Sequence, residues 1–458
     1  MSRLVVVSNR VALPDESRAG GLAVALQAAL AEHGGLWFGW SGKRVREPAA
    51  KPERLRKGDI TYLTLDLSRE EYDGYYAGFA NRSLWPLLHF RLDLVEYSRQ
   101  TLDTYLAVNR RFAEVLAKQL RDDDTVWIHD YHLFPLGALL RERGFGGTIG
   151  FFLHVPVPSS DMMAALPRHE ELFGGLSAYD LVGLQTQRDV ERLQDYMRLY
   201  GDGKIAAGGR ITASDGRRFR VGAFPISIDT ALIERQAADA VGRLAVRRLR
   251  QSMGEHRLAI GVDRLDYSKG LVRRLRAFDQ YLKNNSSRDK RARDLTFLQI
   301  APPSRSDVAA YQRLRNTLEG LAGSINGRHA DPEWTPVRYV NRNFSHDILT
   351  GFYRSASIGL VTPLRDGMNL VAKEFVASQD PEDPGVLVLS RFAGAAYELS
   401  QALLVNPYDL EGTAEAIARA ADMPLAERRE RHAEMMRTLR KYDITAWRRK
   451  YLEALVTR

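Results

Sequence analysis

Residues 357–379 read SIGLVTPLRDGMNLVAKEFVASQ, a pattern that predicts a strand, a turn and a helix in succession. Its first five residues are a short apolar run with branched side chains, which predicts a buried strand. NLVAKEFVASQ has the pattern of a helix, and the turn before it carries Arg365, Asp366 and Gly367. Because glycine lets a backbone approach a ligand closely, the turn predicts a binding site at the end of a strand.

The same order of strand, loop and helix recurs along the chain. Strands are expected at 3–8, 125–130, 148–154 and 180–186, and again at 257–263, 295–300, 337–340, 357–361 and 386–390. This alternation predicts α/β architecture, with parallel sheets covered by helices on both faces. The two series predict two doubly wound, Rossmann-like domains, at 1–235 and 236–440. A final helix at about 441–458 is expected to pack back on the first domain.

The composition of the 458 residues excludes several classes of protein. The chain has no cysteine, which excludes a disulfide framework, thiol nucleophiles and cysteine-ligated metal. No apolar segment reaches the roughly 20 residues of a membrane span, and the N-terminal apolar run is too short for a signal peptide. We therefore expect a cytoplasmic protein. Because no aromatic-interleaved basic groove accompanies the net charge of +9, neither nucleic acid nor membrane is an expected partner.

Three basic clusters and one acidic cluster are expected to be ordinary solvated surface. The basic clusters are VRRLR at 246–250 and 272–276 and WRRK at 447–450, each within a helical pattern. The acidic run DDD at 122–124 precedes its strand, so it belongs to the edge of the sheet away from a ligand. No other cluster has metal-ligand spacing, and we expect no metal and no other cofactor.

The informative polar residues directly follow strands, where parallel sheets bind ligands. The turn at 366–371 offers backbone N–H groups at a helix start, which suit a phosphate or sugar hydroxyls, and Asp366 can accept two hydroxyl hydrogen bonds. Glu374 lies one turn further along and suits a ribose diol. The alternative is an ordinary acidic helix cap with surface charges.

A second turn, VDRLDYSKGL at 262–271, places Arg264 and Lys269 between a strand and a helix. A forked guanidinium and an ammonium suit a diphosphate. The alternative is a surface loop with a salt bridge to Asp263 or Asp266.

The first half of the chain has its own candidates. Arg10 follows the first strand and could hold a phosphate or form an ion pair. Asp130 and His154 follow the next two strands and could serve as acid and base, as metal ligands or in structural hydrogen bonds. Tyr76 and Trp85 could stack on a sugar or belong to the core.

Together these motifs resemble the trehalose-6-phosphate synthases, retaining glucosyltransferases with two facing Rossmann-like domains (the GT-B architecture) and an active site in the interdomain cleft. The resemblance covers nearly the whole chain. It rests on SNR, GGLWFGWSG, LWP, WIHDYHL, FFLH, RLDYSKG, IAPPSR, RDGMNLVAKEF and VNPYD. It departs at Pro303, where a threonine is expected, and the segment PDESRAGG is short.

The resemblance implies UDP-glucose as donor, glucose 6-phosphate as acceptor, and a role in trehalose biosynthesis and osmoprotection. Arg264 and Lys269 would bind the diphosphate, and the donor site would comprise Gly20, Gly21, Phe344 at the uracil, Asp366, Gly367, Met368, Asn369, Leu370, Val371, Ala372, Lys373 and Glu374. The acceptor would bind Arg10, Tyr76, Asp130 and Arg305. Trp40, Trp85 and His154 would shape the pocket that keeps the α configuration. The catalytic set would be Asp130, His154, Arg264, Lys269 and Asp366.

The resemblance also implies front-face attack without a covalent nucleophile or a metal, in which the cations stabilise the leaving diphosphate. Three other functions stay open. They are a glycosyltransferase with another phosphorylated acceptor such as glycerol 3-phosphate, an enzyme that couples cyclitols on the same fold, and a sugar-phosphate sensor without catalysis. A homo-oligomer, either a dimer or a tetramer, is possible.

Overall fold

The computed structural model describes residues 3–14, 21–49, 51–285, 294–304 and 308–457. The chain divides into two compact units, Met1–Pro225 with Thr445–Arg458, and Ile226–Ile444. The domain boundary predicted after residue 235 falls inside helix α9 (Thr230–Ala240). That helix packs against α13, α14 and α16 and so belongs wholly to the second unit.

The first unit is built on a ten-stranded sheet in the order β3-β4-β2-β1-β5-β6-β7-β10-β9-β8. The strands from β4 to β10 in that order pair in parallel, while β3, β9 and β8 run antiparallel to their neighbours. Their bounds are β1 (Leu4–Arg10), β2 (Gly35–Val45), β3 (Glu53–Lys57), β4 (Ile60–Ser68), β5 (Thr125–His129), β6 (Thr148–Phe152), β7 (Leu181–Leu184), β8 (Lys204–Ala206), β9 (Arg210–Thr212) and β10 (Arg218–Ala223).

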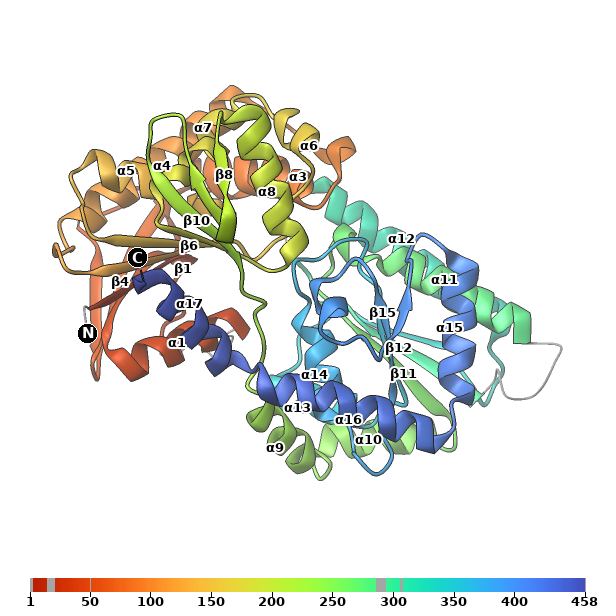
Figure 1. The fold of residues 1–458 in the computed structure, drawn as a ribbon. Helices are drawn as coiled ribbons and strands as arrows, with labels where there is room; N and C mark the ends of the chain where they lie inside the picture. The colour runs from red at the N-terminus through yellow and green to blue at the C-terminus, as the bar shows by residue number, and fades with distance from the viewer. Residues whose placement is uncertain (1–2, 15–20, 50, 286–293, 305–307, 458) are drawn as a thin grey trace. The chain divides into compact units, whose positions relative to one another are not determined.

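Helices cover both faces of this sheet, with α1 and α17 on one face and α4, α5 and α8 on the other (Figure 1). The last helix, α17, packs on the sheet because the ring of Tyr451 stacks on Trp127 and its hydroxyl donates to the carbonyl oxygen of Phe151. The helices are α1 (Gly21–His33), α2 (Arg69–Glu71), α3 (Trp85–Leu88), α4 (Arg99–Ala117), α5 (Leu136–Glu142), α6 (Ser160–Ala164), α7 (His169–Phe173), α8 (Gln187–Tyr200), α17 (Ile444–Val456) and the π-helix η1 (Tyr72–Leu84).

The second unit has a six-stranded, wholly parallel sheet in the order β13-β12-β11-β14-β15-β16. Helices α11, α12 and α15 share one apolar core with its strands. The strands are β11 (Arg257–Val262), β12 (Leu295–Ile300), β13 (Val337–Val340), β14 (Ile358–Val361), β15 (Val386–Ser390) and β16 (Leu403–Val405). The remaining helices are α10 (Leu244–Met253), α11 (Leu271–Asn285), α12 (Ala309–His329), α13 (His346–Arg354), α14 (Leu370–Ser378), α15 (Leu410–Asp422) and α16 (Leu425–Lys441).

Among the parallel strands of each sheet there is one point at which the strand order reverses. In the first unit it lies between β1 and β5, and in the second between β11 and β14. Open α/β sheets bind ligands beyond the carboxyl ends of the strands at such a reversal. Arg10 and Asp130 end or follow the first pair, whereas Arg264, Lys269 and Asp366 follow the second. The predicted residues therefore stand where this topology places a site.

The α/β class and the predicted parallel strands are confirmed, but the surface predictions were wrong at three residues. Arg448, in the WRRK cluster, is buried and pairs with Glu32. Arg274, in the second VRRLR cluster, has only 1% of its side chain exposed. Asp124, the last residue of DDD, is buried and accepts hydrogen bonds from Arg3 at 2.9 Å and from the backbone of Arg121 at 2.8 Å. The sequence alone does not reveal the partners of these charged side chains, because each contact forms only in the folded chain.

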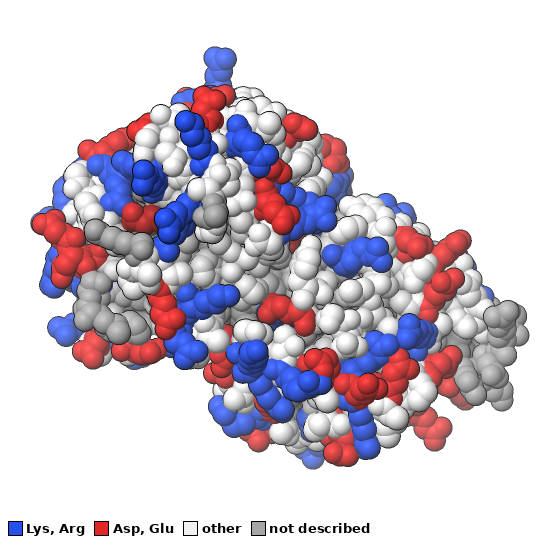
Figure 2. All heavy atoms as spheres, in the orientation of Figure 1, with Lys and Arg blue, Asp and Glu red and all other residues white. Residues whose placement is uncertain are grey.

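The described helices include none that is long and apolar enough to cross a membrane. On the face shown in Figure 2, acidic side chains are interspersed among the basic ones. That face therefore offers no continuous basic stripe of the kind that tracks a nucleic-acid backbone.

Candidate active site

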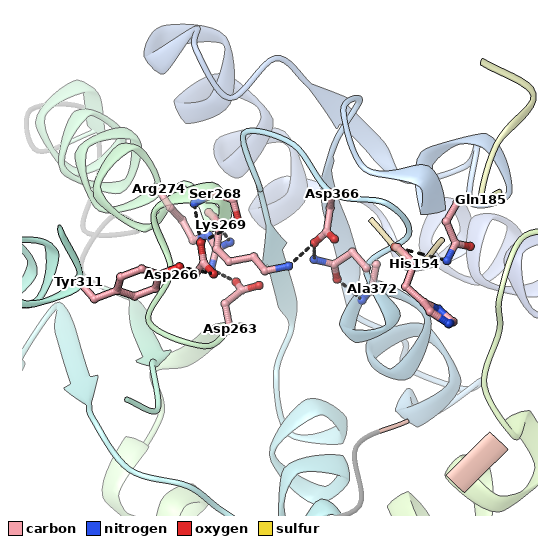
Figure 3. Close-up of polar contacts among 11 residues, drawn as sticks. His154, Gln185, Asp263, Asp266, Ser268, Lys269, Arg274, Tyr311, Asp366 and Ala372 are labelled. Atoms are coloured by element: carbon pink, nitrogen blue, oxygen red, sulfur yellow. Dashed lines mark hydrogen bonds and ion pairs between the residues drawn. The ribbon is translucent and has the colours of Figure 1, made fainter. Parts of the chain in front are cut away.

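The second unit joins its two strand-end turns by an ion pair. Nζ of Lys269, after β11, lies 2.5 Å from Oδ2 of Asp366, after β14, and the two side chains are only 13% and 12% exposed (Figure 3). The alternative, a surface loop with a salt bridge to Asp263 or Asp266, does not describe Lys269, which is largely buried and pairs with Asp366. Lys269 instead brings a cation and a carboxylate together at the strand reversal.

Backbone contacts hold these two turns against each other. Gly270 adopts φ 69°, and a Cβ atom there would stand 2.4 Å from the carbonyl oxygen of Thr362. The backbone N–H of Leu364 donates to the carbonyl oxygen of Ser268 at 2.8 Å. Only glycine fits both the left-handed conformation and the close approach, so Gly270 is required to set Lys269 beside Asp366.

A buried arginine forms hydrogen bonds with residues of both turns. Arg274 donates to Oδ2 of Asp263 at 2.7 Å, to Oγ1 of Thr362 at 3.0 Å and to the carbonyl oxygen of Lys269 at 3.2 Å. Burial raises the pKa of Asp263, and the charge of Arg274 opposes that rise. Sequence reasoning missed Arg274, although its place one turn after the RLDYSKG motif was a usable signal.

The start of α14 is organised by its N-cap. Oδ1 of Asn369 accepts from the N–H of Ala372 at 3.2 Å, while its Nδ2 donates to Oδ2 of Asp366 at 3.0 Å. Asn369 has φ 78°, a conformation that asparagine tolerates better than most residues. The cap occupies one of the N–H groups at this helix start. The cap of α14 is therefore Asn369, whereas Asp366 faces both Lys269 and Asn369 and is not the acidic cap that the alternative proposed.

The side chain of Lys373, a residue of the predicted donor set, points into the interior of the second unit. Its side chain is fully buried, and Nζ lies 2.7 Å from Oε2 of Glu398 and 2.8 Å from the carbonyl oxygen of Ile226. Burial lowers the pKa of Lys373, and Glu398 opposes that shift. The ammonium group is thus held within the second unit, and a role of Lys373 at the donor stays a prediction.

Glu374, predicted at the ribose, lies beside the segment that carries Phe344, predicted at the uracil. Its Oε1 lies 3.4 Å from Nε2 of His346 at the start of α13, and this hydrogen bond raises the pKa of His346. Phe344 packs edge-on against Phe352, with Arg342 4.7 Å from the centre of its ring. The residues predicted for uracil and ribose therefore come from adjoining elements.

In the first unit, Asp130 has an unusual backbone conformation. It follows β5 with φ 76° and ψ 164°, a region that is almost restricted to glycine. Its N–H donates to the carbonyl oxygen of Phe152 at 2.8 Å, and its Oδ1 accepts from the N–H of His154 at 3.2 Å. Such strain, held by neighbouring strands, is typical of functional positions.

Arg10 and three aromatic residues form a group beside this position. A Cβ atom on Gly42 would lie 2.8 Å from Nε of Arg10, so the missing side chain makes room for the guanidinium group. Arg10 pairs in register with Trp40, whose ring centre lies 5.6 Å from that of Tyr76. Tyr76 in turn stacks on His132 at 5.7 Å, from the π-helix η1. Sequence reasoning missed Gly42.

Trp85 and His154 contact different neighbours. Trp85 is 5% exposed, and its ring centre lies 4.0 Å from that of His89 and 5.8 Å from that of Tyr131. His154 lies against His129, with Nε2 of the former 3.1 Å from Nδ1 of the latter. Burial lowers the pKa of His154 to about 3, so its imidazole is neutral at neutral pH.

The remaining predicted residues differ in exposure and in position, and two of them are not described by the structure. Arg264 is exposed, Gly367 and Met368 are buried, Val371 lies in the first turn of α14 with Leu370, and Gly21 begins α1. Gly20 and Arg305 lie outside the described residues. Across the described ranges, no group of three or more histidine, aspartate or glutamate side chains could hold a metal ion.

The geometry offers two kinds of chemistry. The second unit has a cation and a carboxylate set beside a helix start, an arrangement that suits a phosphate next to sugar hydroxyls. The first unit has an arginine, a strained aspartate and a neutral histidine with aromatic neighbours, which suits a polar, ring-shaped substrate.

Comparison with known proteins places the chain among sugar-transferring enzymes. A trehalose-6-phosphate synthase of Sinorhizobium fredii is 50% identical over 99% of this chain and 98% of its own. An E. coli structure bound with UDP-2-fluoro glucose has 46% identity and a TM-score of 0.95, with 100% of this chain and 99% of that one covered. A UDP-forming α,α-trehalose-phosphate synthase of Burkholderia xenovorans, in complex with glucose-6-phosphate, has 46% identity and a TM-score of 0.94, with 99% and 100% covered.

The family model described as glycosyltransferase family 20 matches residues 5–457, which is nearly the whole chain. The strand-end residues of both units fall within that match. The chain belongs to glycosyltransferase family 20.

Proposed function

We propose that this chain transfers glucose from UDP-glucose to glucose 6-phosphate and releases trehalose 6-phosphate and UDP. The second unit binds the donor, and the first unit binds the acceptor. The relatives support these substrates, because one carries UDP-2-fluoro glucose and another carries glucose-6-phosphate.

The observation that carries the proposal is the ion pair between Lys269 and Asp366 at the strand reversal of the second unit. A donor with a diphosphate and a sugar needs a cation for the first and a hydroxyl acceptor for the second. Lys269 supplies the cation, Arg264 follows the same strand, and Asp366 supplies the acceptor. A diphosphate that enters this site competes with Asp366 for Lys269 and leaves the carboxylate to the sugar hydroxyls.

The transfer proceeds with retention of the α configuration at C1 of the donor glucose. The bond from C1 to the diphosphate oxygen breaks, and a bond from C1 to the anomeric oxygen of the acceptor forms on the same face. The acceptor's hydroxyl proton passes to the departing diphosphate. Lys269 and Arg264 stabilise the negative charge that grows on the leaving group.

The two cations take the place of a divalent metal in this mechanism. Activity is therefore expected to be unchanged after incubation with excess chelator, and a loss that magnesium or manganese restores would contradict this part of the proposal.

A donor-by-acceptor matrix tests the function directly. The purified chain is assayed with UDP-, ADP- and GDP-glucose against glucose 6-phosphate, glucose and glycerol 3-phosphate, and the anomeric configuration of the product is read by NMR. We expect the highest kcat/KM with UDP-glucose and glucose 6-phosphate. A product from glycerol 3-phosphate alone, or equal rates with unphosphorylated glucose, would overturn the acceptor.

The cytoplasmic location and a homo-oligomeric state stay predictions from the sequence.

A further inference from the structure

Two histidine rings from neighbouring strands of the first unit contact each other. His129 ends β5 and is completely buried, while His154 follows β6, which pairs with β5 in parallel. Nδ1 of His129 lies 3.1 Å from Nε2 of His154, and the ring centres are 5.4 Å apart at an interplanar angle of 25°. This distance requires one of the two nitrogens to donate a proton to the other.

Both imidazoles are neutral at neutral pH, so each ring carries one proton. Burial lowers the pKa of both histidines, to about 3 for His154, and the proximity of the rings lowers that of His129 further. Only two arrangements then satisfy the contact. Either His129 donates from Nδ1 to His154, or His154 donates from Nε2 to His129.

The outer nitrogen of His129 distinguishes the two arrangements. Its Nε2 atom is buried, and no hydrogen-bond partner for it exists among the residues that the structure describes. If His154 were the donor, the proton of His129 would sit on this nitrogen as a buried N–H without an acceptor. If His129 is the donor, Nε2 keeps only an unpaired acceptor site. A buried N–H group without an acceptor is rarer in proteins, and costs more free energy, than a buried acceptor atom without a donor. This difference favours His129 as the donor.

We infer that His129 is a positioning residue whose Nδ1–H donates to Nε2 of His154 and thereby fixes the proton of His154 on Nδ1. His154 is only partly buried, and its Nδ1 atom makes no hydrogen bond to any other described residue. His154 therefore presents a donor, not an acceptor, to its surroundings. The oxygen of a sugar hydroxyl is the matching partner, and this assignment of a ligand rests on the proposed function.

The same strand end also holds the backbone of His154. Oδ1 of Asp130, the residue after His129, accepts from the N–H of His154 at 3.2 Å. Two consecutive residues thus hold His154, since His129 contacts its ring and Asp130 accepts from its main-chain N–H. An outer partner that sets the tautomer of a functional histidine is a common arrangement in protein sites.

The first test reads the tautomer and needs no substrate. Protein with ¹⁵N-labelled histidine is studied by NMR at neutral pH, and the His154 signals are assigned by their loss in His154→Gln. We expect the Nδ1–H form of His154 in the wild-type chain and a shift toward Nε2–H in His129→Phe. An Nε2–H form in the wild type would overturn the inference, whatever the enzyme's activity.

The second test asks whether the contact matters for transfer. His129→Phe should lose about tenfold in kcat/KM, the magnitude of one hydrogen bond. His129→Asn should recover most of the loss, because its side-chain N–H can stand where Nδ1–H stood. Equal damage in the two variants would mean that His129 acts through packing alone and would overturn the positioning role.

Trp127→Phe is the matched control. Trp127 lies on the same strand, and its ring centre is 4.5 Å from that of His129, so the variant disturbs the packing without touching the hydrogen bond. Its kcat/KM should stay within about twofold of the wild type. Failure of the proposed function would appear instead as a wild-type chain without UDP-glucose activity, while the NMR result would stand.

Discussion

Lys269 and Asp366 are almost a hundred positions apart in the chain, yet their charged groups lie 2.5 Å apart. The ion pair spans the strand reversal of the second unit, because β11 and β14 are adjacent in the sheet. Asn369 adds a third polar group, which donates to the same oxygen of Asp366. The pair is therefore part of a preformed polar site.

Asp366→Asn should damage turnover far more than folding. The substitution keeps the size of the side chain but removes charge-assisted hydrogen bonds worth about 1.5–3 kcal/mol each, which is roughly a ten- to hundredfold loss in kcat/KM. Steady-state kinetics and a thermal melt on the same preparation measure the two effects. A variant with near-normal kcat/KM would reduce Asp366 to a structural residue.

Arg274→Met should destabilise the second unit strongly. It leaves Asp263 buried without its partner, and breaking a buried ion pair costs about 3–5 kcal/mol. Urea unfolding followed by circular dichroism gives the loss. Adding Asp263→Asn to the variant should restore part of it, since the uncompensated charge disappears. Arg276→Met, at an exposed position of the same helix, serves as the control and should change stability by less than about 0.5 kcal/mol.

Asp130→Gly should separate backbone strain from function. Glycine removes the strain of φ 76° and ψ 164°, which costs about 1–3 kcal/mol, whereas Asp130→Ala keeps it. The glycine variant should thus be the more stable of the two in chemical denaturation, and both should lose activity with the carboxylate. If the alanine variant were the more stable, the conformation at this position would carry no strain.

Stability should fall in acid through His129 and His154, whose pKa values are both lowered in the folded chain. In the unfolded chain they titrate near pH 6.5, while in the folded chain burial lowers both pKa values, to about 3 for His154. Their contribution is therefore fully present above pH 6.5 and is lost as the pH falls from 6.5 toward 3. His129→Phe removes one of these groups, so its unfolding free energy should decline less between pH 6.5 and 5. Parallel declines in the two proteins would contradict the lowered pKa of His129.

Arg10→Ala should weaken the acceptor's binding and spare the donor's. We predict that Arg10 holds the phosphate of glucose 6-phosphate, so its removal should cost about ten- to a hundredfold in acceptor affinity. Calorimetric titration with UDP alone, then with glucose 6-phosphate in the presence of UDP, separates the two sites. A fall in UDP affinity with the acceptor spared would reverse the assignment. Gly42→Ala should give a milder version of the same result, because it displaces the guanidinium group of Arg10.

Much of the fold could be predicted from local pattern. Continuous apolar runs such as TIGFF and VLVLS mark strands buried on both faces, and their alternation with helices implies parallel sheets. The parallel strands β2, β4, β10 and β16, the antiparallel strands β3, β8 and β9 and the π-helix η1 were not predicted. The glycines of β2 and the polar residues that alternate with apolar ones in β4 interrupt the continuous apolar run. Exposed or short strands lack the continuous apolar signal, and a π-helix shares its composition with an α-helix.

The residue types that follow each strand can be read from the order of letters along the chain. Arg10, Asp130, Lys269 and Asp366 could be named on this ground. The partner of each side chain, in contrast, depends on how the helices and strands pack. Lys373 and Glu374 are neighbours in the sequence, yet the structure buries the ammonium of one against Glu398 and sets the carboxylate of the other beside His346. The physical reason is that a helix turns successive side chains about 100° apart, so packing against different elements gives adjacent residues different partners.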